Sequence, residues 1–178
     1  MDCESLKVFA DRYYRDKDIM HNMWHIELTE RWVKRILDLG GYEIDEECLM
    51  CALYFHGFIW SDEEAVRSWL AQQGVPSDRI ERIVKVAWES QRSEIPETLE
   101  GRILHDAHVL EGGKTYLVVK TLITGSVRGQ SLTDTIGYMK KNVLDKNRCY
   151  LPETAALCAE MNEYARRFIE ELEAGITA

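Results

Sequence analysis

Apolar residues recur along this chain mostly three or four positions apart, which is the spacing of helices. The clearest stripe consists of Ile80, Ile83, Val84 and Ala87, at i, i+3, i+4 and i+7. Comparable stripes predict helices within residues 6–13, 26–37, 45–56, 61–70, 98–109, 132–144 and 152–174. Residues 114–124 fit either a strand or a buried helix, and we favour a helix because no second strand is available to pair with it. The pattern predicts an all-α fold of eight or nine helices.

Capping residues mark several of the predicted helix ends. Asp45 and Thr98 each precede an apolar-periodic segment and can cap it. Ser61 and Glu64 have the spacing of a capping box that would open the next helix. Gly57, directly after a run of large apolar residues, is expected to weaken or end the helix before it.

Composition is that of a compact soluble protein. The chain has 178 residues, of which 46% are apolar, enough for one domain spanning residues 1–178 with its own core. It contains no run of 18 apolar residues and no signal-peptide pattern, and its five cysteines are an odd number. We therefore expect no membrane association, reduced thiols and a cytoplasmic location.

The charge balance argues against nucleic acid as a partner. The formal net charge is -9, and the nearest approach to a basic cluster is the pair Lys140 and Lys141. A small anionic substrate remains compatible with this charge, because a local cation or a bound metal dominates the field at short range.

Five histidines carry the candidate chemistry. His21 and His25 are four residues apart, so a helix would place both on one face. His56 ends an apolar stretch, and Asp106 lies among apolar neighbours in Ile-Leu-His-Asp-Ala-His-Val. A buried carboxylate needs a cation or several hydrogen-bond donors, and a metal ion would supply the cation. The alternative is a plain helical scaffold with unrelated histidines, which leaves Asp106 without a cation.

Three segments together resemble the HD-domain metal-dependent phosphohydrolases. They are His-Asn-Met-Trp-His-Ile, Ala-Leu-Tyr-Phe-His-Gly and Glu-Gly-Arg-Ile-Leu-His-Asp-Ala-His-Val-Leu-Glu. The resemblance covers about residues 18–112 and leaves residues 113–178 as additional C-terminal helices. It implies a single-domain multi-helix bundle that binds one divalent ion, of Mn, Fe, Ni, Mg or Zn, through His25, His56 and Asp106. The implied substrate is a small phosphorylated molecule, either a phosphomonoester or a nucleotide.

Two positions depart from the family pattern. Gly57 stands where the family has the aspartate of its His-Asp pair, and His108 stands where it often has the second aspartate of Asp-Ala-Asp. Loss of the carboxylate at position 57 makes a catalytically inert protein that binds a small ligand or a protein partner the alternative function. Restoring it with Gly57→Asp is expected to strengthen metal binding.

The resemblance also suggests residues around the metal. Asp62 and Glu63 follow His56 where relatives place an acidic residue near the site, and they are the candidate catalytic acids and bases. Arg128, Lys114 and Lys120 could bind the phosphate of the substrate. The oligomeric state has no signature in the sequence.

Overall fold

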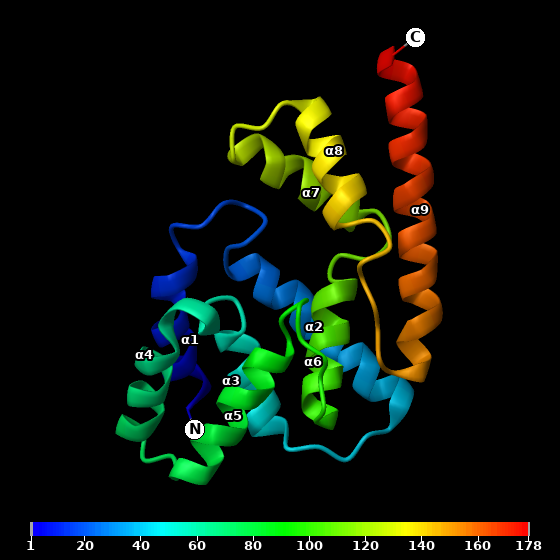
Figure 1. Ribbon diagram of the computed structural model, residues 1–178. Helices are drawn as coiled ribbons and strands as arrows, with labels where there is room; N and C mark the ends of the chain where they lie inside the picture. The colour runs from blue at the N-terminus through cyan, green and yellow to red at the C-terminus, as the bar shows by residue number, and fades with distance from the viewer. Residues whose placement is uncertain (1, 178) are drawn as a thin grey trace.

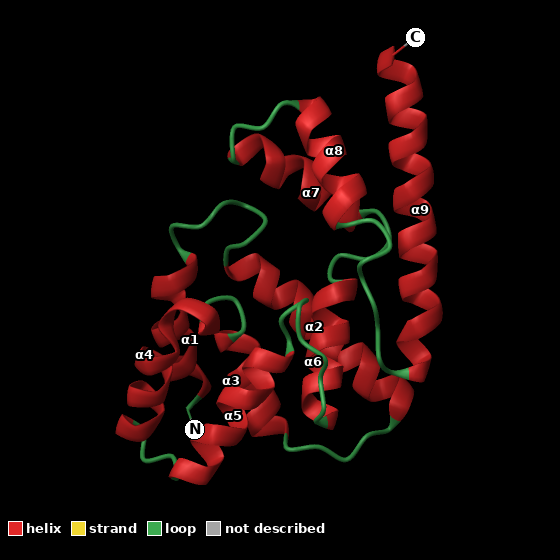
Figure 2. Cartoon of the chain, viewed as in Figure 1, coloured by secondary structure: helices red, strands yellow, loops and turns green. Residues whose placement is uncertain are grey.

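The computed structural model describes residues 2–177, and within this range it is built of nine helices and contains no strand (Figures 1 and 2). The helices are α1 (Cys3–Tyr14), α2 (Met23–Gly40), α3 (Glu46–Phe55), α4 (Ile59–Gln72), α5 (Ser77–Glu89), α6 (Leu99–Leu110), α7 (Tyr116–Val127), α8 (Leu132–Asn142) and α9 (Pro152–Thr177). The all-α prediction is confirmed, including a helix rather than a strand after residue 114. None of the helices between residues 2 and 177 is long and apolar enough to cross a membrane.

Two of the predicted helix caps form, and one does not. The side chain of Asp45 accepts from the Cys48 amide at 3.0 Å, and Thr98 caps α6. α4 begins at Ile59, before the expected capping box, and has a kink at Asp62 (φ -131°, ψ 30°). The Ser61 hydroxyl lies 3.1 Å from the Phe58 carbonyl oxygen and 2.5 Å from the Asp62 carboxylate. The predicted start of this helix was therefore wrong, because α4 continues directly from the turn at residues 56–58.

The core is divided into two hydrophobic clusters that meet at α6. The first cluster joins α1 to α5 with residues such as Ile103 and Leu104 of α6, and the second joins α7, α8 and α9 with Val109 and Leu110 at the end of α6. Figure 1 shows α6 beside α2 in the middle of the molecule, with α9 along one side and the α7–α8 pair above. The position of α6 therefore controls how the two clusters face each other.

Asp106 fixes α6 against the start of α9. Its side chain is fully buried, and its carboxylate accepts from the amides of Tyr150 and Leu151 at 2.9 Å and from the Thr154 hydroxyl at 2.6 Å. The two amides directly precede α9 and Thr154 lies in its first turn, where the helix dipole favours a negative charge. The donors thus supply the stabilisation that a buried carboxylate needs.

Replacing Asp106 by alanine is expected to destabilise the protein strongly. The change leaves the amides of Tyr150 and Leu151 without an acceptor, whereas the Thr154 hydroxyl can still donate to the Leu151 carbonyl at 2.9 Å, so at about 1–3 kcal/mol for each amide we expect a loss of at least about 2 kcal/mol. Urea unfolding followed by circular dichroism measures the difference. Asp11→Ala is the matched control: this carboxylate is 46% exposed and pairs with Arg15 on the surface, so its loss should cost under about 1 kcal/mol. Equal losses in the two variants would contradict the assignment.

Candidate metal centre and its cavity

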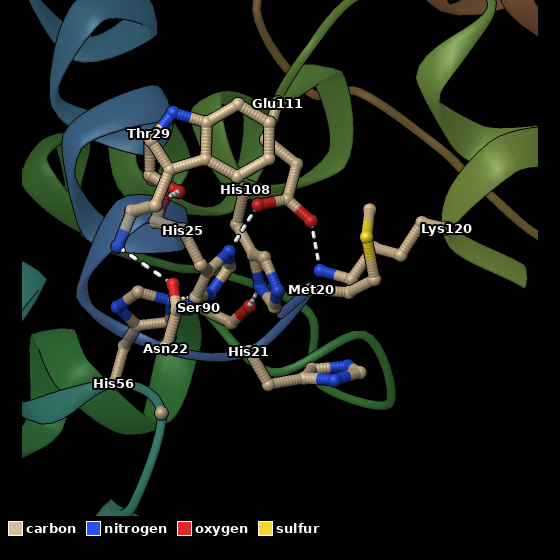
Figure 3. Close-up of polar contacts among 12 residues, drawn as sticks. Met20, His21, Asn22, His25, Thr29, His56, Ser90, His108, Glu111 and Lys120 are labelled. Carbon is tan, nitrogen blue, oxygen red and sulfur yellow. Dashed lines mark hydrogen bonds and ion pairs between the residues drawn. The ribbon is translucent and has the colours of Figure 1, made fainter. Parts of the chain in front are cut away.

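Three histidines from separate elements converge on one point. His25 lies on α2, His56 follows the last residue of α3, and His108 lies on α6. One ring nitrogen of each lies within 4.8 Å of the other two, and the Nε2 atoms of His25 and His56 are 2.8 Å apart. Figure 3 shows the three rings facing a common centre. His25 and His56 are 3% and 1% exposed, so their polar atoms must find partners inside the protein.

Each of the three rings uses its Nδ1 atom to bond an acceptor. His25 bonds a carboxylate oxygen of Glu111, His56 the Leu53 carbonyl at 2.5 Å, and His108 the Ser90 carbonyl at 3.1 Å. Because these oxygens accept hydrogen bonds, each Nδ1 carries the proton and each Nε2 of a neutral ring presents a lone pair. Two lone pairs 2.8 Å apart repel each other unless a proton or a metal ion lies between them. The opposed lone pairs therefore require a cation between them.

Burial disfavours a proton as that cation, because it disfavours the charged form of imidazole. It lowers the pKa of His56 to about 4 and the pKa values of His25 and His108 well below their ordinary range. The ammonium of Lys120 lowers all three further. The imidazoles are consequently neutral near pH 7, which is the form that binds a metal ion.

Glu111 links the histidines to a buried lysine. One of its carboxylate oxygens bonds His25 and the other pairs with the Lys120 ammonium, as Figure 3 shows. Such a carboxylate fixes the tautomer and orientation of a metal-binding imidazole. Sequence reasoning missed Glu111, although an acidic residue three positions after His108 and next to Leu110 is the signal that could have identified it.

A cavity of about 290 Å³ opens beside the three histidines, and its lining is positively charged. Lys17, Arg92, Lys120 and Arg128 line it, whereas none of the described lining residues is an aspartate or a glutamate. Arg128 and Lys120 were predicted from the sequence as phosphate ligands, and both line the cavity. Lys17 and Arg92 were not, because each lies in a turn after a helix, where the sequence gave no sign that the side chain reaches the same space.

The structure keeps the other predicted site residues away from this cavity. Asp106, expected as the third metal ligand, bonds the start of α9, and His108 takes its place beside His25. Glu63 bonds Arg67 at 2.6 Å and Trp88 at 2.7 Å. Asp62 lies against the Ser61 hydroxyl, and the Lys114 ammonium lies 5.6 Å from the centre of the Tyr164 ring. Asp62, Glu63 and Lys114 do not line the cavity.

The buried side chain of Tyr14 occupies the space beside Gly57. Its hydroxyl donates to the Tyr54 carbonyl at 3.0 Å and accepts from the Gly57 amide at 3.1 Å. A Cβ atom at position 57 would lie 2.5 Å from this hydroxyl oxygen and 2.7 Å from ring carbon Cε1. The expectation that Gly57→Asp strengthens metal binding is therefore corrected, because the carboxylate has no room at the site.

Comparison with solved structures places the fold among known proteins. The chain is 15% identical to Bacillus subtilis YpgQ in complex with ADP, with a TM-score of 0.75 over 98% of each chain. A protein of Lactobacillus plantarum gives 16% identity and a TM-score of 0.81 over 98% of this chain and 96% of that one. An HD-superfamily hydrolase of Bacillus thuringiensis gives 15% identity and a TM-score of 0.72 over 98% and 96%.

At these identities the likeness establishes the fold alone, which is a helical bundle of the HD-hydrolase type. No family model matches the chain, and no curated protein matches it.

Gly57→Ala should destabilise the protein by about 1–3 kcal/mol, because the added methyl group meets a buried ring held by two hydrogen bonds. The difference in unfolding free energy is measured with urea. In a Tyr14→Leu background the same change should cost much less, since the obstructing ring is gone. A cost that is the same in both backgrounds would show that Tyr14 is not the obstacle.

Proposed function

We propose that this protein binds one divalent metal ion through His25, His56 and His108 and hydrolyses a phosphomonoester or a nucleotide. The observation that carries the proposal is the convergence of three imidazoles, each with its Nδ1 bonded, at the edge of a cavity lined by cations. The shared fold with an HD-superfamily hydrolase supports the reaction class, and the ADP bound by YpgQ supports a nucleotide. His108 replaces Asp106 in the ligand set expected from the sequence.

The bound ion would polarise a phosphoryl oxygen and lower the pKa of a water molecule, which is the chemistry of catalytic sites with three protein ligands. The chain itself supplies the surroundings. Lys17, Arg92 and Arg128 line the cavity and would bind the non-bridging phosphate oxygens, so that their charges would stabilise the negative charge that develops in the reaction. Trp60 lines the same cavity and is 66% exposed, so it offers a face on which a nucleobase can stack.

His21 is the candidate proton acceptor of the reaction. Its Nδ1 lies 2.9 Å from both carboxylate oxygens of Asp18, which holds the ring with Nε2 unprotonated, and the ring lines the cavity. Burial lowers the pKa of His21, so the ring is neutral and able to accept a proton near pH 7. This role replaces the one expected for Asp62 and Glu63.

A specific observation also favours a second function, ligand binding without catalysis. The described residues that line the cavity include no carboxylate, so His21 alone would have to accept the proton. If a phosphorylated ligand binds and is never hydrolysed, the protein is a binding module with the same pocket.

The metal site is tested by metal analysis of purified protein and a phosphoester panel assayed with added Mn²⁺, Fe²⁺, Ni²⁺, Mg²⁺ or Zn²⁺. His56→Ala should lose both stoichiometric metal and hydrolysis, because two of three ligands hold an ion weakly. Glu63→Gln, at a residue bonded to Arg67 and Trp88, is the control and should retain both. Hydrolysis that persists undiminished in His56→Ala would refute the proposal.

His21→Gln should lower kcat by about 10²-fold, the usual contribution of a general base, while KM and metal content change little. Steady-state kinetics and metal analysis on the same preparation separate these quantities. If His21→Gln instead removes the metal, His21 is a ligand; if kcat is unchanged, it is not the proton acceptor.

A further inference from the structure

The ligand atoms at the three-histidine site are nitrogen only. The imidazoles of His25, His56 and His108 are fixed with Nε2 inward, and each of them is an uncharged ligand. Imidazole suits zinc, copper, nickel and iron, whereas magnesium, calcium and manganese prefer the oxygens of carboxylates, carbonyls and water. The donor chemistry therefore distinguishes between classes of ion.

Three oxygen-bearing groups that lie close to His56 or His108 in sequence are already engaged. Both carboxylate oxygens of Glu111 are bonded, one to His25 and one to Lys120. The carboxylate of Asp106 bonds the start of α9. The Gly57 carbonyl accepts from the Lys17 ammonium at 2.7 Å, and a side chain at this position is blocked by Tyr14. Glu111, Asp106 and Gly57 thus offer a hard cation no free oxygen, and the Thr124 hydroxyl, which lines the cavity without a hydrogen-bond partner, is uncharged.

The local charge also disfavours a hard cation at this site. Four cationic side chains line the cavity, and Glu111, the carboxylate bonded to a site histidine, is itself paired with Lys120. An ion held mainly by electrostatic attraction to anionic oxygens meets net repulsion here. An ion that forms strong bonds to nitrogen can overcome this repulsion.

We propose that the site selects a nitrogen-preferring ion of the zinc and nickel class and discriminates against Mg²⁺, Ca²⁺ and Mn²⁺. The inference rests on the metal site of the proposed function and is independent of hydrolysis. Within this proposal His108 determines the selectivity. An oxygen ligand at this position would change the all-nitrogen set into one of two imidazoles and one carboxylate.

The measurement is binding affinity on the purified, metal-stripped chain. Zn²⁺ and Ni²⁺ affinities come from competition with a chromophoric chelator, and Mg²⁺, Ca²⁺ and Mn²⁺ affinities from isothermal titration calorimetry. Zn²⁺ should bind on the order of 10³-fold or more tightly than Mg²⁺, following the preference of imidazole ligands. Co²⁺ serves as a spectroscopic probe, and its visible absorption should change in His108→Ala.

His108→Asp is the decisive variant. Exchange of one nitrogen ligand for a carboxylate should reduce the ratio of Zn²⁺ to Mn²⁺ affinity by about 10-fold or more, because it introduces the oxygen ligand that Mn²⁺ prefers. His105→Gln is the matched control: His105 is also buried on α6, but its ring packs against Tyr150, so the ratio should not change. Circular dichroism confirms that both variants are folded.

The outcomes separate this inference from the proposed function. Mg²⁺ or Mn²⁺ binding as tightly as Zn²⁺, or an unchanged affinity ratio in folded His108→Asp, overturns the selectivity even if the protein hydrolyses phosphoesters. Tight, selective Zn²⁺ binding without hydrolysis supports the selectivity and refutes the catalytic proposal. If no divalent ion binds, both fail.

Discussion

The hydrogen bonds of the Asp106 carboxylate set the orientation of α6, and much of the molecule depends on this helix. A carboxylate that is fully buried requires donors, and the start of α9 provides three of them at 2.6–2.9 Å. Once Asp106 faces α9, helical geometry turns His108, two residues later, by about 200° to the other side of α6. That side faces His25 and His56. The same contact that joins the two hydrophobic clusters therefore also presents the third histidine to the site.

The need to satisfy buried polar groups explains the histidines as well. Each imidazole has two nitrogen atoms, and in all three rings the Nδ1 atom has an acceptor supplied by the fold: Glu111, the Leu53 carbonyl or the Ser90 carbonyl. The remaining nitrogen atoms have only one another. A protein that needed these rings merely to fill its core would leave buried lone pairs opposed to each other, which is costly. The arrangement is accounted for if a cation belongs between them.

The sequence predicted the helices well and the site only in part. Helix positions followed from periodicity and from local signals such as Asp45 and Thr98, which act within a few residues. His25 and His56 followed from the family resemblance. The sequence could not show that His108, and not Asp106, lies beside His25 and His56, because spacing indicates only that the two face opposite sides of α6. That distinction depends on the donors of residues 150–154, more than 40 positions away, and no local pattern encodes them.

Lys17 and Tyr14 could not be predicted for a similar reason. Both lie near the start of the chain, and they reach Gly57 only through the packing of α1 against α3. In the sequence, Gly57 stood out only because it lacks the carboxylate that the family resemblance leads one to expect there. The structure shows that the space beside it is filled by a phenol ring, with an ammonium group on its carbonyl oxygen.

Both departures from the family pattern make the same site less negatively charged. Gly57 and His108 each stand where the resemblance leads one to expect a carboxylate, and Lys17 adds a positive charge beside the first of them. A chain with a formal net charge of -9 thereby encloses a cavity lined by four cationic side chains. Low-dielectric walls strengthen the field inside such a cavity, so the local charge and not the global one determines which ligand enters. The proposed phosphorylated ligand would be attracted to this site, and it would give a metal ion held by the nitrogen ligands the negative charge that the protein does not provide.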